Sequence, residues 1–205
     1  MTNATDLSAL ISKGFGRAAQ RTGSEYLVFR PNGAINPLSN RNRIGTILVT
    51  FPGEALTDLK VSEYREALFE TKCIKVGDYL KGAEGVFFVC GLPQYAQPLC
   101  ALTNRLVSLA RPVRPALGAY AGGYSFGLTG MASAWPARVL ALGNHSASVM
   151  PGESRLAVWS IELPALPFSP CASDVIKDDL GRSFVISSAD ETRAGWMLVA
   201  KQIGS

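Results

Sequence analysis

Two stretches of this chain carry the same pattern of residues in the same order. Asp78–Lys81 is followed by Gly85–Val89, and Asp174–Lys177 is followed by Gly181–Val185; Asp, Lys, Gly, Phe and Val coincide without a gap. An apolar pair after the Asp, a glycine-containing turn and a return run rich in β-branched and aromatic residues are typical of a β-hairpin. Convergent patterning and tandem duplication both produce such an echo. The sequence favours duplication, and therefore a pair of similar β-modules.

Short runs of β-branched and aromatic residues fill most of the chain after Gly23, each bounded by Gly, Pro, Asn or Asp. Their close spacing predicts antiparallel sandwiches or small barrels rather than a parallel sheet with crossover helices. The expected strands are 25–30, 44–51, 78–81, 86–90, 99–109, 137–142, 155–163, 174–177, 183–188 and 196–202.

Helical periodicity is confined to two segments. Apolar residues recur every three or four positions over 6–21, which predicts an amphipathic helix that starts at Asp6 and ends at Gly23. Residues 62–71 place Tyr64, Leu68 and Phe69 on one side and predict a second, shorter helical segment.

These elements predict a mainly β fold, with two small sandwich-like or barrel-like modules and a short N-terminal helix. We expect a helical arm over 1–24, a first β-module over 25–112 and a second β-module over 137–205. The intervening segment, 113–136, is rich in Gly, Pro and aromatic residues and is expected to be a linker or loop.

Composition excludes several classes of protein. A chain of 205 residues that is 47% hydrophobic can bury a core without a disulfide or a metal. No apolar stretch is long enough for a spanning helix, and the N-terminus does not have the pattern of a secretory signal, so we expect no membrane partner. The formal net charge of +4 is spread along the chain, which is typical of an ordinary solvated surface.

Cysteine spacing gives no sign of a metal or redox centre. Cys73, Cys90, Cys100 and Cys171 include no CxxC pair and have no histidine nearby. We therefore expect reduced, mostly buried thiols and no metal or cofactor.

One catalytic motif occurs, but the sequence after it does not supply the acid and the histidine that its serine would need in that order. Gly123–Gly127 satisfies G-x-S-x-G around Ser125, which in a hydrolase needs an acid and then a histidine later in the chain. The one histidine, His145, follows without an Asp or Glu in between, so a serine hydrolase is the weakest hypothesis. We expect no catalytic residues and no enzymatic activity.

Apolar residues of the helix and aromatic residues of the glycine-rich segment are the candidate contacts between subunits, because exposed aromatic and apolar groups are typical of interfaces. The aromatic group would alternatively fold back over the gap between the modules. The candidate contacts are Leu7, Leu10, Ile11, Phe15, Tyr120, Tyr124, Phe126 and Trp135.

Several segments resemble virion structural proteins of tailed bacteriophages and prophages. The resemblance rests on Gly14–Ala19, Tyr26–Pro31, Val76–Leu80 with its Gly85–Val89 return, Asn104–Pro112, and Asp174–Ile186 with the closing Trp196–Ala200.

The resemblance implies a non-enzymatic building block in the virion, assembled in the host cytoplasm as a homo-oligomeric ring. The ring would lie at the head–tail junction or in the tail, in contact with other head, neck and tail proteins and with DNA passing through a central channel. The alternative is a cytoplasmic β-sandwich module that binds a ligand or a protein.

Overall fold

The described residues form one helix and then two six-stranded antiparallel sheets, in this order along the chain. The computed structural model describes residues 4–52, 64–113, 127–142 and 157–203. Helix α1 (Ala4–Thr22) comes first. The N-terminal sheet consists of β1 (Ser24–Phe29), β2 (Arg43–Val49), β3 (Arg65–Glu66), β4 (Tyr79–Gly82), β5 (Gly85–Gly91) and β6 (Leu99–Leu102), with a 3₁₀ turn, η1 (Asn40–Asn42), before β2. The C-terminal barrel consists of β7 (Arg105–Pro112), β8 (Leu128–Ala141), β9 (Val158–Leu163), β10 (Val175–Asp178), β11 (Ser183–Thr192) and β12 (Gly195–Ile203).

The two halves have the same strand order. The N-terminal sheet runs β2-β1-β4-β5-β6-β3, and the C-terminal barrel runs β8-β7-β10-β11-β12-β9 before β9 pairs with β8 and closes it. In the N-terminal sheet the corresponding ends meet, among the described residues, at a single bridge between Thr50 and Leu68, with N···O distances of 3.1 and 2.8 Å. The prediction of a mainly β fold with two barrel-like modules and a short N-terminal helix is confirmed.

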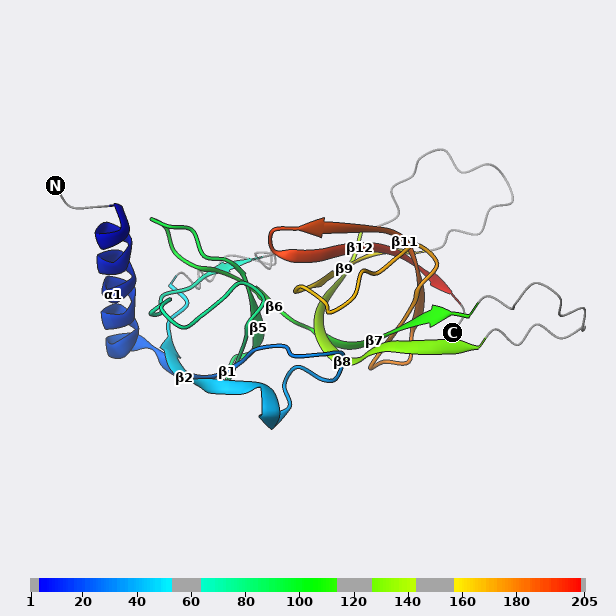
Figure 1. Cartoon of the computed structure of the whole chain (residues 1–205), viewed down its shortest axis with the longest axis horizontal. Coiled ribbons are helices and arrows are strands. Elements are labelled where there is room, and N and C mark those ends of the chain that lie inside the picture. The colour runs from blue at the N-terminus through cyan, green and yellow to red at the C-terminus, as the bar shows by residue number, and fades with distance from the viewer. Residues whose placement is uncertain (1–3, 53–63, 114–126, 143–156, 204–205) are drawn as a thin grey trace, which may run out of the picture.

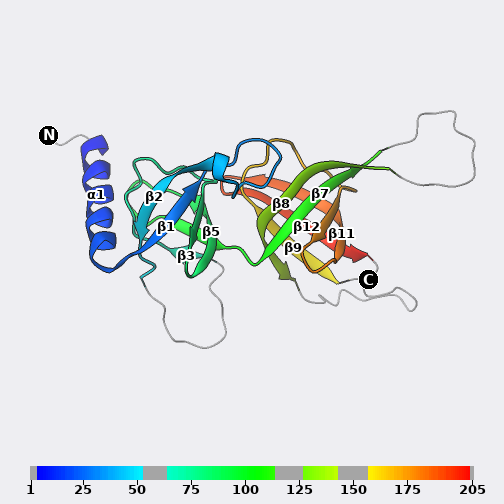
Figure 2. The ribbon, with the colours of Figure 1, turned by 90° about the horizontal axis from the view of Figure 1, so that it is seen from below.

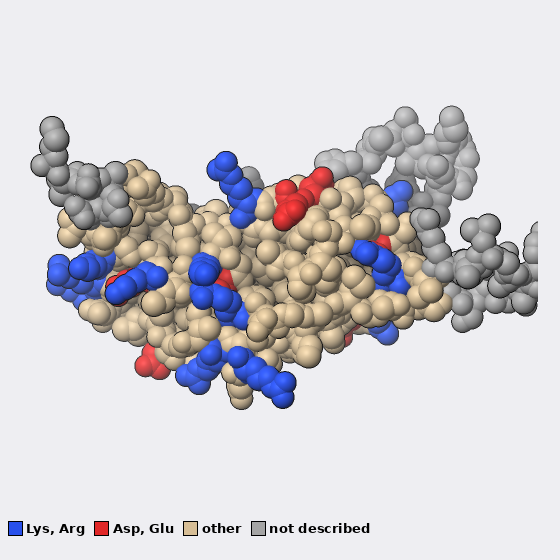
Figure 3. Space-filling model, in the orientation of Figure 1, with Lys and Arg blue, Asp and Glu red and all other residues tan. Residues whose placement is uncertain are grey.

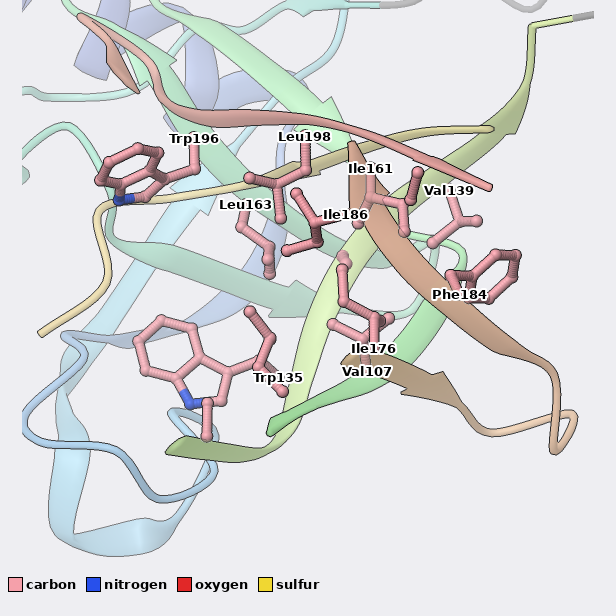
Figure 4. Packing of buried hydrophobic residues seen from close by; sticks show 14 residues of the cluster. Val107, Trp135, Val139, Ile161, Leu163, Ile176, Phe184, Ile186, Trp196 and Leu198 are labelled. Carbon is pink, nitrogen blue, oxygen red and sulfur yellow. The ribbon is translucent and has the colours of Figure 1, made fainter. Parts of the chain in front are cut away.

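Matching positions fill the two interiors. Six interior positions of the N-terminal sheet have a counterpart in the barrel when the paired strands are superposed by their register, and all twelve side chains are at most 1% exposed. In the sheet these are Tyr26, Val28, Leu80, Phe87, Val89 and Cys100. Their counterparts in the barrel, in the same order, are Val107, Leu109, Ile176, Phe184, Ile186 and Ala200. Figure 4 shows how the side chains of the barrel converge on its interior.

The repeated hairpin is offset by one residue on its return strand. Leu80 pairs with Phe87, whereas Ile176 pairs with Phe184, because the second turn holds one residue more than the first. The gapless match of the sequences aligns Phe88 with Phe184, but the structure makes Phe87 the counterpart of Phe184.

An arginine–aspartate clamp occurs in the N-terminal sheet directly after β1. Arg30 donates from Nε and Nη2 to the two carboxylate oxygens of Asp78, at 2.8 and 2.7 Å, and from Nη2 to the carbonyl of Cys73 at 2.9 Å. The Lys75 N–H donates to the same carboxylate at 2.8 Å. Gly77, which precedes the Asp, has φ +91°.

The same clamp occurs in the C-terminal barrel. Arg111 of β7 donates from Nε and Nη2 to Asp174, both at 2.8 Å, and from Nη2 to the carbonyl of Ser169 at 2.9 Å. The Cys171 N–H donates to Asp174 at 2.9 Å, and Ser173 adopts φ +77°. Because strand order, interior positions and this hydrogen-bond set all coincide, the two halves are structural repeats.

The division between the repeats lies earlier than the sequence predicts. The expected strand 99–109 is two strands: Thr103 N–H donates to Val86 in the sheet, and Asn104 N–H donates to Ala137 in the barrel. β7 therefore belongs to the second half. The expected linker 113–136 is partly strand, because β8 already begins at Leu128.

Residues 64–71 form no helix. Ala67 and Phe69 are both fully buried, and Arg65 and Glu66 pair with β6 as strand β3. The period of the buried positions is two rather than 3.6, so the apparent helical face of Tyr64 and Leu68 was misleading. Residues 62 and 63 lie outside the described ranges.

Helix α1 lies at one end of an elongated molecule, followed by the N-terminal sheet and then the barrel (Figures 1 and 2). It begins at Ala4, two residues before the expected Asp6, and stops before Gly23 as predicted. A Cβ at Gly23 would lie 2.4 Å from the carbonyl oxygen of Ala19, so only glycine fits this exit.

The helix packs along the weakly paired seam of the N-terminal sheet. The Ser12 and Thr71 hydroxyls lie 2.8 Å apart, those of Thr22 and Thr50 lie 3.0 Å apart, and Ala19 is 1% exposed. No helix among the described residues is long and apolar enough to cross a membrane.

Candidate functional site

The junction between the two halves is a buried and hydrogen-bonded contact. The Tyr79 hydroxyl donates to the Pro136 carbonyl at 2.7 Å, and the Trp135 indole N–H donates to the Ala34 carbonyl at 3.1 Å. These two contacts hold the sheet against the barrel. Asn104, the first residue on the barrel side, exchanges two hydrogen bonds with the backbone of Val139, at 2.9 and 2.8 Å, and so fixes the start of β7 to β8.

Aromatic side chains on the outer face of the N-terminal sheet fill this junction. Phe29, Tyr79 and Phe88 are at most 3% exposed although they point away from the interior of their own sheet. Both faces of β4 and β5 are therefore covered. This explains the continuous apolar run of β5, which is typical of strands buried on both sides.

A small pocket opens at the edge of the junction. Its volume is about 60 Å³, and it lies between Tyr64, Phe88 and Cys90 of the first half and Glu162, Trp196 and Met197 of the barrel. An apolar cavity of about 150 Å³ binds one benzene molecule, so this smaller pocket has room for the end of one aliphatic side chain rather than for a metabolite.

Glu162 is the charged group of the pocket, and it is fully engaged. Both of its carboxylate oxygens accept from Arg138 Nη1 at 3.0 Å, and the Tyr64 hydroxyl donates to it at 3.2 Å. Arg138 is only 4% exposed. Burial, and next the neighbouring Glu162 charge, raises the pKa of Tyr64 to about 12.

The pocket provides contact surface and no activated nucleophile among its described groups. Burial raises the pKa of the Cys90 thiol to about 12, so the thiol stays protonated at neutral pH. The Tyr64 phenol is neutral as well, and the Glu162 carboxylate is paired with Arg138. Within the described residues no group of three or more His, Cys, Asp or Glu side chains is arranged to hold a metal ion.

The outward face of α1 is the second notable surface. Leu7 and Leu10 are 49% and 60% exposed. Lys13, Arg17 and Arg21 are exposed as well and recur every four residues, so they form one stripe along the helix. Figure 3 shows Lys and Arg side chains gathered at this end of the molecule.

The structure separates the predicted contact residues. Leu7 and Leu10 face solvent, whereas Ile11 and Phe15 are half-buried. Trp135 is 0% exposed, so it is not the surface contact between subunits that the sequence predicted. Its indole N–H donates to the Ala34 carbonyl of the other half, which agrees for this residue with the alternative that the segment folds back over the gap between the modules. Tyr120, Tyr124 and Phe126 lie outside the described residues, as do Ser125 and His145.

Two of the four cysteines behave as predicted. Cys90 and Cys100 are buried and reduced, but Cys73 and Cys171 are exposed. The exposed pair lies in the turns that hold the two clamps. The Cys73 carbonyl accepts from Arg30, and the Cys171 N–H donates to Asp174. Arg111 Nη2 also donates to the Cys171 sulfur, at 3.4 Å.

Sequence reasoning missed the junction residues. The available signal was the run of apolar residues in β5, which leaves no polar outer face on that strand. Glu162 and Tyr64 carried no comparable signal, because they are distant in sequence and meet only across the junction.

Comparison with protein-family models, with curated proteins and with solved structures finds no match to this chain.

Proposed function

We propose that this protein is a non-enzymatic structural subunit that assembles with copies of itself into a ring, at the head–tail junction or in the tail of a tailed phage virion. The observation that carries the proposal is the outward face of α1, where Leu7 and Leu10 are exposed on a helix whose other side is docked. Exposed leucines beside one another are costly in water unless a partner covers them. The resemblance of several segments to phage virion proteins is the reason for proposing a ring in the neck or tail as the assembly.

The chemistry of the junction pocket also supports a structural role. Its thiol and phenol are held neutral and its carboxylate is held by Arg138, so the pocket offers shape and apolar surface. A ligand-binding module is the second candidate function, because the junction has a pocket lined by side chains of both halves. Its volume of about 60 Å³ favours a protein side chain over a free small molecule.

Light scattering on the purified protein tests the assembly. We expect a mass of several subunits for the native chain and a shift toward monomer in Leu7→Gln/Leu10→Gln, because both side chains are exposed and the change leaves the core intact. Leu180→Gln is the matched control, since Leu180 is 59% exposed on the barrel, far from α1. A native chain that is monomeric at every concentration refutes the assembly.

Electron microscopy of the host's virions tests the location. We expect the protein in purified particles and defective necks or tails when it is removed. Normal particles without it would exclude the virion role.

A further inference from the structure

The outer wall of the junction pocket continues as one row of side chains across the barrel. Arg138 pairs with Glu162, Glu162 with Met197, and Met197 with Asp190, so these residues share one face of four adjacent strands. Met197 is 42% exposed at the rim of the pocket, and Asp190 next to it is exposed. The row therefore presents an apolar hollow followed by a negative charge.

The exposed face of α1 presents the complementary order. Leu10 is followed one turn later by Lys13, with about 5–6 Å between such positions on a helix. Met197 and Asp190 are direct cross-strand neighbours, which lie about 4.5–5.5 Å apart. A helix laid on the row thus places a leucine at the pocket and a lysine beside Asp190 at the same time.

Charge agrees with this placement. The described exposed side chains of α1 include three cations, Lys13, Arg17 and Arg21, and none of the three forms an ion pair with a described residue. On the rim, Asp190 and Glu191 are exposed and Arg193 offsets one of them, while the Glu162 charge is offset by Arg138. The rim is left with a net negative charge opposite a basic helix.

The helix that fits cannot be the chain's own. α1 is held at the end of the molecule by the Ser12–Thr71 and Thr22–Thr50 contacts, with the N-terminal sheet between it and the barrel (Figures 1 and 2). A contact from the end of one copy to the middle of another uses two different surfaces. Such heterologous contacts generate rings when the rotation closes.

We infer that α1 of one copy docks on the junction pocket of the next, with Leu10 in the hollow beside Met197 and Lys13 paired with Asp190. This inference rests on the proposed self-assembly and specifies the two surfaces that carry it. The contact explains why the pocket has the volume of a side chain, and why the α1 leucines remain uncovered in a single chain.

A charge swap tests the inference by sedimentation equilibrium on the full chain. Lys13→Glu and Asp190→Lys each place like charges together, and we expect each to weaken association about 5- to 10-fold. The double variant restores the pair with its signs exchanged, and we expect its association to return to within about 2-fold of the native value. Lys177→Glu changes an exposed barrel lysine outside the row and is the control, expected to leave association unchanged.

The outcomes separate this inference from the proposed function. Assembly that is indifferent to both single reversals, or a double variant as weak as the product of the singles, overturns the α1–pocket contact and leaves self-assembly standing. A native chain that never associates overturns both. Circular dichroism of each variant confirms that the fold is intact.

Discussion

The clamp in the C-terminal barrel predicts a large loss of stability when a single oxygen of Asp174 is replaced by an amide nitrogen. Asp174 is 3% exposed and accepts hydrogen bonds from Arg111 Nε, Arg111 Nη2 and the Cys171 N–H. Asp174→Asn keeps the volume and one acceptor oxygen but removes the charge. Arg111 then loses its opposite charge and one of its two hydrogen bonds to this side chain, and an amide NH2 replaces one acceptor oxygen.

The magnitude follows from how deeply the pair is buried. Removing one partner of a buried ion pair costs about 3–5 kcal/mol. The Arg111 side chain is 39% exposed and recovers part of its hydration, so the low end applies. We expect Asp174→Asn to lower the free energy of unfolding by about 3 kcal/mol, and a cycle with Arg111→Met to give a coupling of about 2 kcal/mol.

Urea unfolding followed by tryptophan fluorescence measures this loss in the barrel, because Trp135, Trp159 and Trp196 are the protein's three tryptophans and all lie there. Asp78→Asn, followed by circular dichroism, makes the matched change in the N-terminal sheet. The repeated hydrogen-bond set predicts a similar loss there. A loss below about 1 kcal/mol at both positions would refute the reasoning that the clamps stabilise the repeats.

The effect also depends on pH. Burial alone would raise the pKa of Asp174, but the Arg111 hydrogen bonds, the Cys171 N–H and the Arg111 charge outweigh it and lower that pKa. A lowered pKa stabilises the fold above the unfolded value of about 3.9, and the stabilisation disappears as pH falls through the folded value. The difference between native chain and Asp174→Asn should therefore shrink in acid; a constant difference would contradict the pairing.

Two further predictions concern backbone strain and thiols. Ser173 adopts φ +77° where its counterpart is glycine, so Ser173→Gly relieves strain and should raise the free energy of unfolding by about 0.5–1 kcal/mol in urea titrations; a loss would contradict it. Thiol labelling at pH 8 should modify Cys73 and Cys171 in the native chain but reach Cys90 and Cys100 only after unfolding. Because burial raises the pKa of Cys90 to about 12, stability should fall as pH rises above about 8.5; labelling of all four native thiols would refute this burial.

Local pattern was enough to predict most strands and the hairpins. Turn glycines and alternating apolar residues are short-range signals, and the repeated Asp-to-Val segment marked both copies of one hairpin. The N-terminal helix was predictable for the same reason, down to its end at Gly23.

Pairings between distant segments were not predictable in this way. Nothing local divides the apolar run 99–109, because the change of partner at Thr103 and Asn104 is decided by which sheet each backbone group reaches. β3 was equally hidden, since two residues of strand depend on β6 rather than on their own sequence.

The clamps left one readable trace. Arg30 and Arg111 are each followed by proline, and each repeat carries its Asp at the matching hairpin. The Arg-Pro pair and the hairpin Asp occur in both repeats, which indicates that both use the same contact. The Arg and Asp that form each ion pair are 48 and 63 residues apart, so their pairing could not be read from local sequence. The candidate site was still harder to predict, because Trp135 looked like a loop residue and is a core residue of β8.

The single bridge between Thr50 and Leu68 has a kinetic consequence. The C-terminal barrel is closed by four consecutive residue pairs between β8 and β9, whereas in the part of the N-terminal sheet that the structure describes one pair and the docked helix close the seam. Partial opening should therefore begin at this seam, so amides around Thr50 and Leu68 should exchange their hydrogens earlier than those of the barrel. Undocking of α1 would also expose the strand edges along this seam, and exposed edges can pair with another chain. The docked helix therefore protects the protein against aggregation during assembly.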